Sequence, residues 1–96
     1  MNYLGVEEST LSNELELTVY PNPASNLVTL SVTSINSERA TIEIRDSLGK
    51  LISSSVMNVN AGLNTILIDV SNLNSGVYHL SLLAKNQVVS ESVVIE

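Results

Sequence analysis

Apolar and polar residues alternate along most of the chain, as in β-strands that have one buried face. Between residues 14 and 19 the apolar positions are Leu15, Leu17 and Val19, and the positions between them are polar. Successive side chains of a strand point to opposite faces, so this segment has one apolar and one polar face. Related patterns, weakest at 51–56, recur at about residues 27–33, 40–45, 51–56, 65–70, 77–84 and 88–95. These seven segments predict an all-β domain.

Turn-forming residues separate the segments. Pro21 and Pro23 cannot donate backbone hydrogen bonds, so the first strand ends before them. A glycine in the turn at residues 46–50 predicts a hairpin, and the serines at 53–55 leave the register of its returning arm weakly specified. We expect a slip or a bulge in that arm. A strand spacing of roughly 10–12 residues without helical segments predicts a single immunoglobulin-like Greek-key β-sandwich of about seven antiparallel strands.

Residues 1–13 show no hydrophobic periodicity and contain several serine, asparagine and glutamate residues. We interpret them as a flexible linker, and residues 14–96 as the β-sandwich. The 96 residues suffice for one domain with a modest core of its own.

One local pattern predicts a corner of the sandwich. Leu73 is followed three residues later by Gly76, and Tyr78 stands two residues after that glycine. In immunoglobulin-like sandwiches, a tyrosine near the start of a strand bonds through its hydroxyl group to the backbone a few residues upstream. The sequence therefore predicts a hydrogen bond from Tyr78 to the preceding turn.

Composition and charge narrow the range of partners. Apolar residues make up 44% of the chain but aromatic residues only 3%, so the core must be aliphatic. The formal charge of −6 opposes binding to nucleic acid or to an anionic membrane. No apolar run approaches the ~18–20 residues that span a bilayer, and the acidic start of the chain does not resemble a signal peptide. We expect no nucleic-acid partner and no direct membrane insertion.

The sequence shows no arrangement suited to catalysis or to a cofactor. His79 is the single histidine, cysteine is absent, and the only two aspartates, Asp46 and Asp69, do not form a calcium-binding loop. No serine lies in a Gly-x-Ser-x-Gly elbow, and the glycines form no phosphate-binding cluster. We expect no enzymatic activity, no metal and no cofactor. The residues alone predict a small acidic β-sandwich that binds or displays something.

Four blocks of the sequence form an ordered set of motifs. They are residues 17–24 with Tyr-Pro-Asn-Pro-Ala, residues 44–51 with a Gly-Lys turn, residues 73–80 with Leu-x-x-Gly-x-Tyr, and the apolar terminal strand at 88–95. In order and spacing they resemble the C-terminal sorting domains carried by cargo of the type IX (Por) secretion system of Bacteroidetes. The residues that carry the resemblance are Tyr20, Pro21, Asn22, Pro23, Ala24, Gly49, Lys50, Gly76, Val77, Tyr78, Val93, Val94 and Ile95.

This resemblance implies a targeting function. Such a domain directs a cargo protein across the outer membrane and is commonly removed by a sortase at the cell surface. The implied partners are the outer-membrane translocon, shuttle and sortase proteins of the type IX machinery. The protein would pass through the periplasm to the cell surface or the extracellular space, and we expect a monomer. The alternative is an immunoglobulin-like accessory or carbohydrate-binding module of a secreted enzyme.

Some motifs also have purely structural interpretations. Pro21 and Pro23 can simply keep an edge strand from pairing, and residues 76–78 can serve the corner alone. Residues 93–95 are apolar at consecutive positions, so both faces of the terminal strand carry hydrophobic side chains. We expect an edge strand with a spare apolar face and unpaired backbone groups, which a secretion receptor reads by strand addition. The alternative is that the core and the linker cover both faces.

Overall fold

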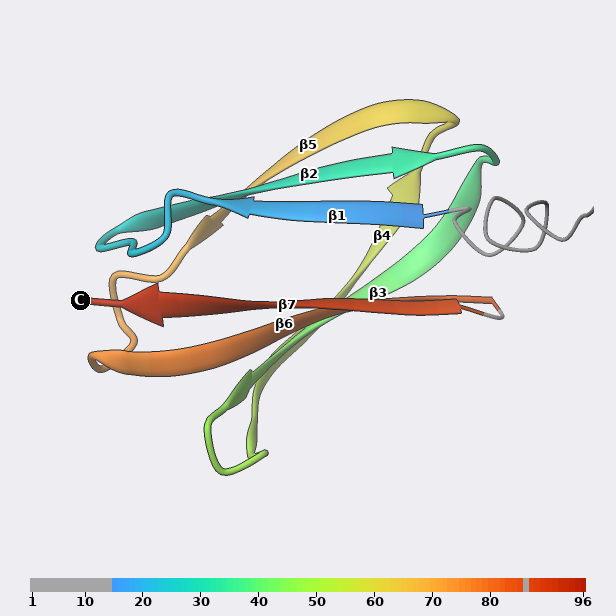
Figure 1. Cartoon of the computed structure of the whole chain (residues 1–96). Helices are drawn as coiled ribbons and strands as arrows, with labels where there is room; N and C mark the ends of the chain where they lie inside the picture. The colour runs from blue at the N-terminus through green and yellow to red at the C-terminus, as the bar shows by residue number, and fades with distance from the viewer. Residues whose placement is uncertain (1–14, 86) are drawn as a thin grey trace, which may run out of the picture.

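The computed structural model describes residues 15–85 and 87–96, which form seven β-strands (Figure 1). The linker predicted at residues 1–13 lies outside the described residues. Each of the seven segments expected from the alternation contains a strand, so the all-β prediction is confirmed. The strands are β1 (Leu15–Tyr20), β2 (Leu27–Ser34), β3 (Glu38–Asp46), β4 (Leu51–Val59), β5 (Gly62–Asp69), β6 (Gly76–Ala84) and β7 (Gln87–Ile95).

The strands form two antiparallel sheets that face one another as a sandwich (Figure 1). One sheet has the strand order β1-β2-β5 and the other has the order β4-β3-β6-β7. Because β2 pairs with β5 and β3 pairs with β6, the chain crosses between the sheets instead of forming only successive hairpins. These crossings give the Greek-key sandwich that the strand spacing predicts.

Alternate residues of the strands build the core between the sheets. In β2, Val28, Leu30 and Val32 are fully buried, and Leu80 and Leu82 of β6 belong to the same buried cluster. Each such aliphatic side chain contributes roughly 1.5–3 kcal/mol when it is fully removed from water. The core is aliphatic, as the composition predicts, with Tyr78 as its one aromatic member among the described residues.

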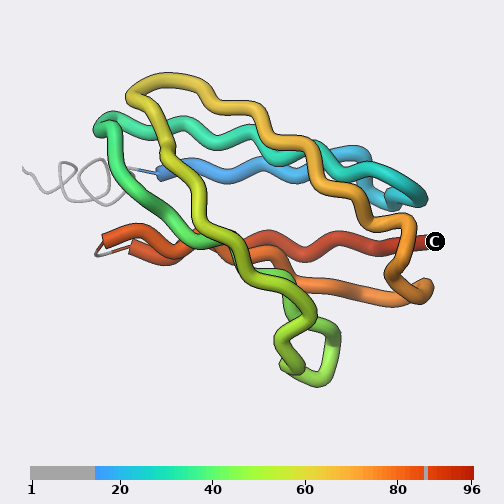
Figure 2. Tube along the Cα trace, turned by 180° about the vertical axis from the view of Figure 1, so that it is seen from behind, coloured from blue at the N-terminus to red at the C-terminus, as the bar shows by residue number. Residues whose placement is uncertain are grey.

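The two sides of the sandwich differ. On one side β1 lies beside β7 (Figure 1). On the other side the β3–β4 hairpin turns away from the remaining strands, and its tip projects from the sandwich (Figure 2). Ile44 pairs with Ser53 but Arg45 pairs with Leu51, so Ile52 is an extra residue in β4, which confirms the irregularity expected in this arm.

Asp46 organises the turn at the tip of this hairpin. Its Oδ1 accepts hydrogen bonds from the backbone N–H groups of Leu48 and Lys50, both at 2.9 Å. The backbone N–H of Gly49 donates to the carbonyl of Asp46 at 3.0 Å. Gly49 has a φ of +89°, which residues with a side chain rarely adopt, so the turn depends on glycine here. The predicted Gly-Lys turn is confirmed.

The predicted tyrosine corner is also present. Tyr78 is buried at the start of β6, and its hydroxyl group donates a hydrogen bond of 2.7 Å to the carbonyl oxygen of Asn74. The N–H of Leu73 donates to the carbonyl of Val70 at 3.0 Å, and the side chain of Leu73 packs against the core. These contacts fix the connection that leads from β5 in one sheet to β6 in the other.

We predict that Tyr78→Phe lowers the free energy of unfolding by about 0.5–1.5 kcal/mol, because the Asn74 carbonyl loses its buried donor while the ring keeps its packing. Urea unfolding measures the change. Tyr20→Phe is the matched control, since the Tyr20 side chain is 44% exposed and its hydroxyl can be hydrated, and it should change stability by less than about 0.5 kcal/mol. Equal effects of the two variants would contradict the corner.

Candidate functional site

The connection from β1 to β2 lies against the end of β7. It begins with Pro21 and Pro23, whose preceding peptide bonds are both cis and whose side chains are exposed. Since proline has no backbone N–H, only Asn22 and Ala24 can donate from this stretch. We call residues 21–24 the proline loop.

Asn22 bonds to the backbone of β7 through its side chain. Its Oδ1 accepts a hydrogen bond of 2.9 Å from the N–H of Val94, and its Nδ2 donates to the carbonyl of Ser92 at 3.3 Å. A carboxamide combines a donor and an acceptor, as a peptide group of a neighbouring strand does. The Asn22 side chain therefore takes the place of a strand residue beside β7.

Ala24 continues this pairing with its backbone. Its N–H donates to the carbonyl of Val94, and its carbonyl accepts from the N–H of Glu96, both at 2.8 Å. These two bonds make a short parallel bridge between Ala24 and Ile95. The methyl group of Ala24 is 3% exposed and belongs to the core. Asn22 and Ala24 together cover the outer edge of β7 from Ser92 to Glu96.

On its other side, the end of β7 pairs with the start of β6. Gly76 lies opposite Ile95, Val77 lies opposite Val94, and Tyr78 lies opposite Val93. Val93 and Ile95 are buried, whereas Val77 and Val94 are neighbours on the outer face and are 43% and 39% exposed. We call the proline loop, residues 76–78 and residues 92–96 together the terminal corner.

The structure corrects one expectation for the terminal strand. The backbone of Val94 is not unpaired, because its N–H and its carbonyl are bonded to Asn22 and Ala24. Both inward side chains of residues 93–95 belong to the core, and the outward one lies beside Val77. Strand addition by a receptor at this edge would first have to displace the proline loop.

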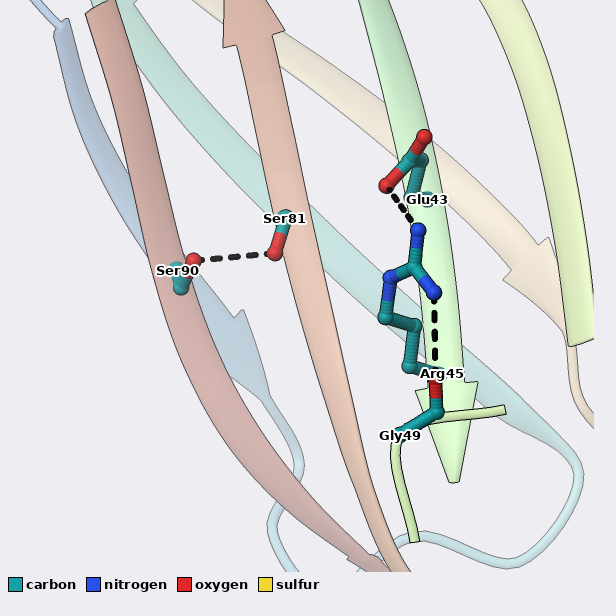
Figure 3. A network of polar contacts seen from close by, with 5 residues as sticks. All are labelled: Glu43, Arg45, Gly49, Ser81 and Ser90. Carbon is teal, nitrogen blue, oxygen red and sulfur yellow. Dashed lines mark hydrogen bonds and ion pairs between the residues drawn. The ribbon is translucent and has the colours of Figure 1, made fainter. Parts of the chain in front are cut away.

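The hairpin motif lies apart from the terminal corner. Gly49 and Lys50 stand at the projecting tip of the β3–β4 hairpin (Figures 1 and 2). Arg45 ties this tip to β3, since its Nη1 donates to the carbonyl of Gly49 at 3.0 Å and its Nη2 lies 3.2 Å from Oε1 of Glu43 (Figure 3). Tyr20 ends β1 opposite Thr29 and is also outside the corner.

Hydroxyl groups link β6 and β7 on the outer face beside the corner. The Oγ atoms of Ser81 and Ser90 are 2.9 Å apart (Figure 3), and Nδ1 of His79 lies 3.1 Å from Oγ of Ser92. His79 is exposed, as its position in the alternation predicts. Its imidazole therefore serves a surface hydrogen bond between two strands.

Asp69 carries the one resolved pKa shift among the described residues. The hydroxyl and the backbone N–H of Ser71 both donate to its Oδ1, at 2.6 and 2.9 Å, and they lower the pKa of this carboxyl group. A lowered pKa means that the contribution to folding is present above the unfolded-state pKa and is lost as the pH falls through the folded-state pKa. The carboxylate caps the turn that follows β5 and leads toward β6.

The terminal corner offers hydrogen-bonding groups and exposed apolar side chains. The described residues contain no cluster of three or more histidine, cysteine, aspartate or glutamate side chains that could hold a metal ion. Within the same residues, no helix is long and apolar enough to cross a membrane. The corner is suited to recognition of its shape and of the exposed pair Val77 and Val94.

Comparison with known families decides the classification. The family described as "Secretion system C-terminal sorting domain" matches residues 18–96 of the chain. The chain belongs to this family. The resemblance of the four sequence blocks to type IX sorting domains is thereby confirmed, and the match favours a sorting domain over an accessory module. None of the curated proteins compared with the chain matches it.

A solved structure shares the fold of this sorting domain. Dimeric latent PorU from Porphyromonas gingivalis superposes with a TM-score of 0.67 at 14% identity, over 84% of this chain and 9% of that protein. The sorting domain thus spans a small part of that protein's length. A β-glucosidase from Listeria innocua in complex with glucose gives a TM-score of 0.48 at 13% identity, over 85% of this chain and 16% of the other. Because this TM-score is below 0.5, the β-glucosidase supports no conclusion about the domain.

Sequence reasoning missed the partners of the motif residues in the sorting domain. Ser92 and Glu96 bind the proline loop through backbone groups, which leave no signal in the side-chain pattern. Asn74 is different, because the tyrosine-corner pattern predicts an acceptor a few residues before Tyr78. The signal for Asn74 was therefore available from the spacing.

We predict that Asn22→Ala lowers the free energy of unfolding by about 0.5–2 kcal/mol, because it removes two side-chain hydrogen bonds to β7. Asn22→Asp keeps an acceptor for the N–H of Val94 but places a carboxylate oxygen against the carbonyl of Ser92. It should therefore also lower the free energy of unfolding. Amide hydrogen exchange should become faster at Val94 in both variants. Unchanged protection of that amide would show that the Asn22 side chain does not hold β7.

Proposed function

We propose that this domain is the sorting signal that directs a cargo protein through the type IX secretion system, and that it has no catalytic role of its own. The observation that supports this most directly is the family match over residues 18–96. The ordered motif blocks lie within or overlap that range. The proposed partners are the outer-membrane translocon, shuttle and sortase proteins.

In this proposal the cargo reaches the periplasm first, and the folded domain is recognised there. The terminal corner is the proposed recognition site, because three of the four motif blocks meet in it. Its exposed apolar pair, Val77 and Val94, offers side chains that a receptor can bury without unfolding the domain. Release of the cargo at the cell surface or into the medium would follow, with a sortase removing the domain.

The first test is export of a reporter. A fluorescent reporter with a periplasmic export signal, fused ahead of residues 1–96, should cross the outer membrane of a host that has the type IX machinery. The same reporter without the domain should stay in the periplasm. Retention of the fusion in a host that exports its own cargo normally would contradict the proposal.

The corner is tested with a matched pair of variants in the same fusion. Val77→Ser with Val94→Ser should reduce export by about tenfold or more, since interface anchors each contribute more than about 1 kcal/mol. Leu63→Ser with Leu67→Ser removes two exposed leucines from β5 in the other sheet and should leave export unchanged. Urea unfolding of the purified domains checks that both variants remain folded. Equal export by the two variants would exclude the corner as the recognition site.

We expect the sortase to cut within residues 1–16, because the sequence before β1 lacks the periodicity of a packed strand and proteases need extended, accessible chain. Mass spectrometry of the released cargo locates the new C-terminus. A cut after Tyr20 would contradict this assignment, because it would lie inside the folded sandwich.

A further inference from the structure

The outer edge of β4 has no partner within the described residues. β4 is the first strand in the order β4-β3-β6-β7, so β3 bonds to only one of its two edges. Its residues 51–56 are exposed on both faces, including Val56, which is 61% exposed. Figures 1 and 2 show the hairpin standing away from the other sheet, so no strand of the sandwich shields this edge.

β4 has only one of the features that usually protect an edge strand, a bulge at Ile52 near its start. Natural edge strands carry charges, prolines or bulges, or are covered by another segment. In this domain the proline loop covers the end of β7, and β1 ends at Pro21 and lies beside β7. By contrast, Leu51–Val59 contains nine residues with no charge, no proline and no glycine. Such a sequence readily adds a further strand.

The distribution of charge indicates which strand can be added. The β3–β4 hairpin, residues 38–59, contains three acidic and three basic residues, so its formal charge is zero. The whole formal charge of −6 therefore lies in the rest of the chain. Two copies of this acidic chain repel one another through their net charge, and a contact of β4 with β4 adds no charged residue of that strand to this repulsion.

We propose that β4 pairs antiparallel with β4 of a second copy, so that two four-stranded sheets join into one of eight strands. Two-fold symmetry is the commonest arrangement of a homodimer, and it requires a self-complementary contact. An axis at Ser55, the central residue of β4, brings Ser54 of one copy opposite Val56 of the other and aligns residues 53–57, which follow the bulge at Ile52. Because β4 has no charged side chain, no like charges of the two strands meet across this axis.

β4 is favoured over β5, an edge strand of the other sheet whose one charged residue is Asp69 at its end, for a physical reason. In β5 the inward residues Ile66 and Ile68 already pack against the core, so an added strand would cover only the outer face. At β4 an added strand covers exposed side chains on both faces. The inference does not depend on the sorting function. The proposal differs from the monomer expected from the sequence. It predicts that the domain is monomeric at low protein concentration and dimeric at high protein concentration.

Sedimentation equilibrium of the full chain tests the proposal. The mass should rise from one chain to two with a dissociation constant on the order of 100 µM, in the range of weak interfaces. Because the facing strands are uncharged, the constant should change by less than about twofold between low and high salt. A mass of one chain up to about 1 mM would overturn the proposal.

A matched pair of variants tests the register. Ser54→Lys with Val56→Lys places lysines opposite lysines across the axis and should weaken the dimer by about tenfold or more. Ser54→Lys with Val56→Glu places each lysine opposite a glutamate, so it should retain the dimer at low salt and lose affinity as salt is added. Far-UV circular dichroism and urea unfolding verify that both remain folded. Equal weakening in the two variants would overturn the antiparallel register at Ser55.

A control at the other free edge completes the test. Thr65→Lys with Leu67→Lys has the same spacing on β5 and should leave the dissociation constant within about twofold of the wild type. Loss of the dimer in this variant, with the dimer retained in the β4 double-lysine variant, would place the contact on β5 and overturn the proposal. So would a dimer that none of the three variants weakens.

Discussion

Backbone hydrogen bonding at the strand edges is the constraint on which the form of this domain depends. Two open sheets leave four edge strands, β1, β5, β4 and β7, and each has N–H and C=O groups that its own sheet does not bond. These edges differ in whether another segment of the domain bonds to them. At the end of β7 the side chain of Asn22 and the backbone of Ala24 supply the missing partners. At β4 no described residue bonds to the outer edge, and the β3–β4 hairpin carries no net charge.

This difference follows from where the chain can reach. The proline loop connects β1 to β2 beside β7, so it can fold over the end of that strand. The tip of the β3–β4 hairpin projects away from the other sheet, and no connecting segment among the described residues passes along its outer edge (Figure 2). The strong local twist of a two-stranded ribbon makes such divergence expected. Residues 51–56 of this arm, which include three serines, are exposed because the twist removes them from the core.

The parts of the fold that could be predicted from the sequence are those encoded locally. The inward positions of β2 and β6, such as Leu30 and Leu82, follow from the two-residue period of a strand. The Tyr78 corner follows from a spacing of a few residues. The residue that bonds to the edge of the terminal strand could not be predicted, because this partner, Asn22, lies 72 residues before Val94. A run of three apolar residues gives no information about which neighbour bonds to their backbone.

The bond between Asn22 and Val94 has a consequence for the order of folding. A contact across 72 residues closes a loop that contains most of the domain, so it is entropically expensive until the intervening strands have assembled. During synthesis, this contact cannot form before Val94 leaves the ribosome. The proline loop and the end of β7 thus come together only in a chain whose sandwich has formed. A receptor that binds both segments at once distinguishes folded cargo domains from nascent or misfolded ones.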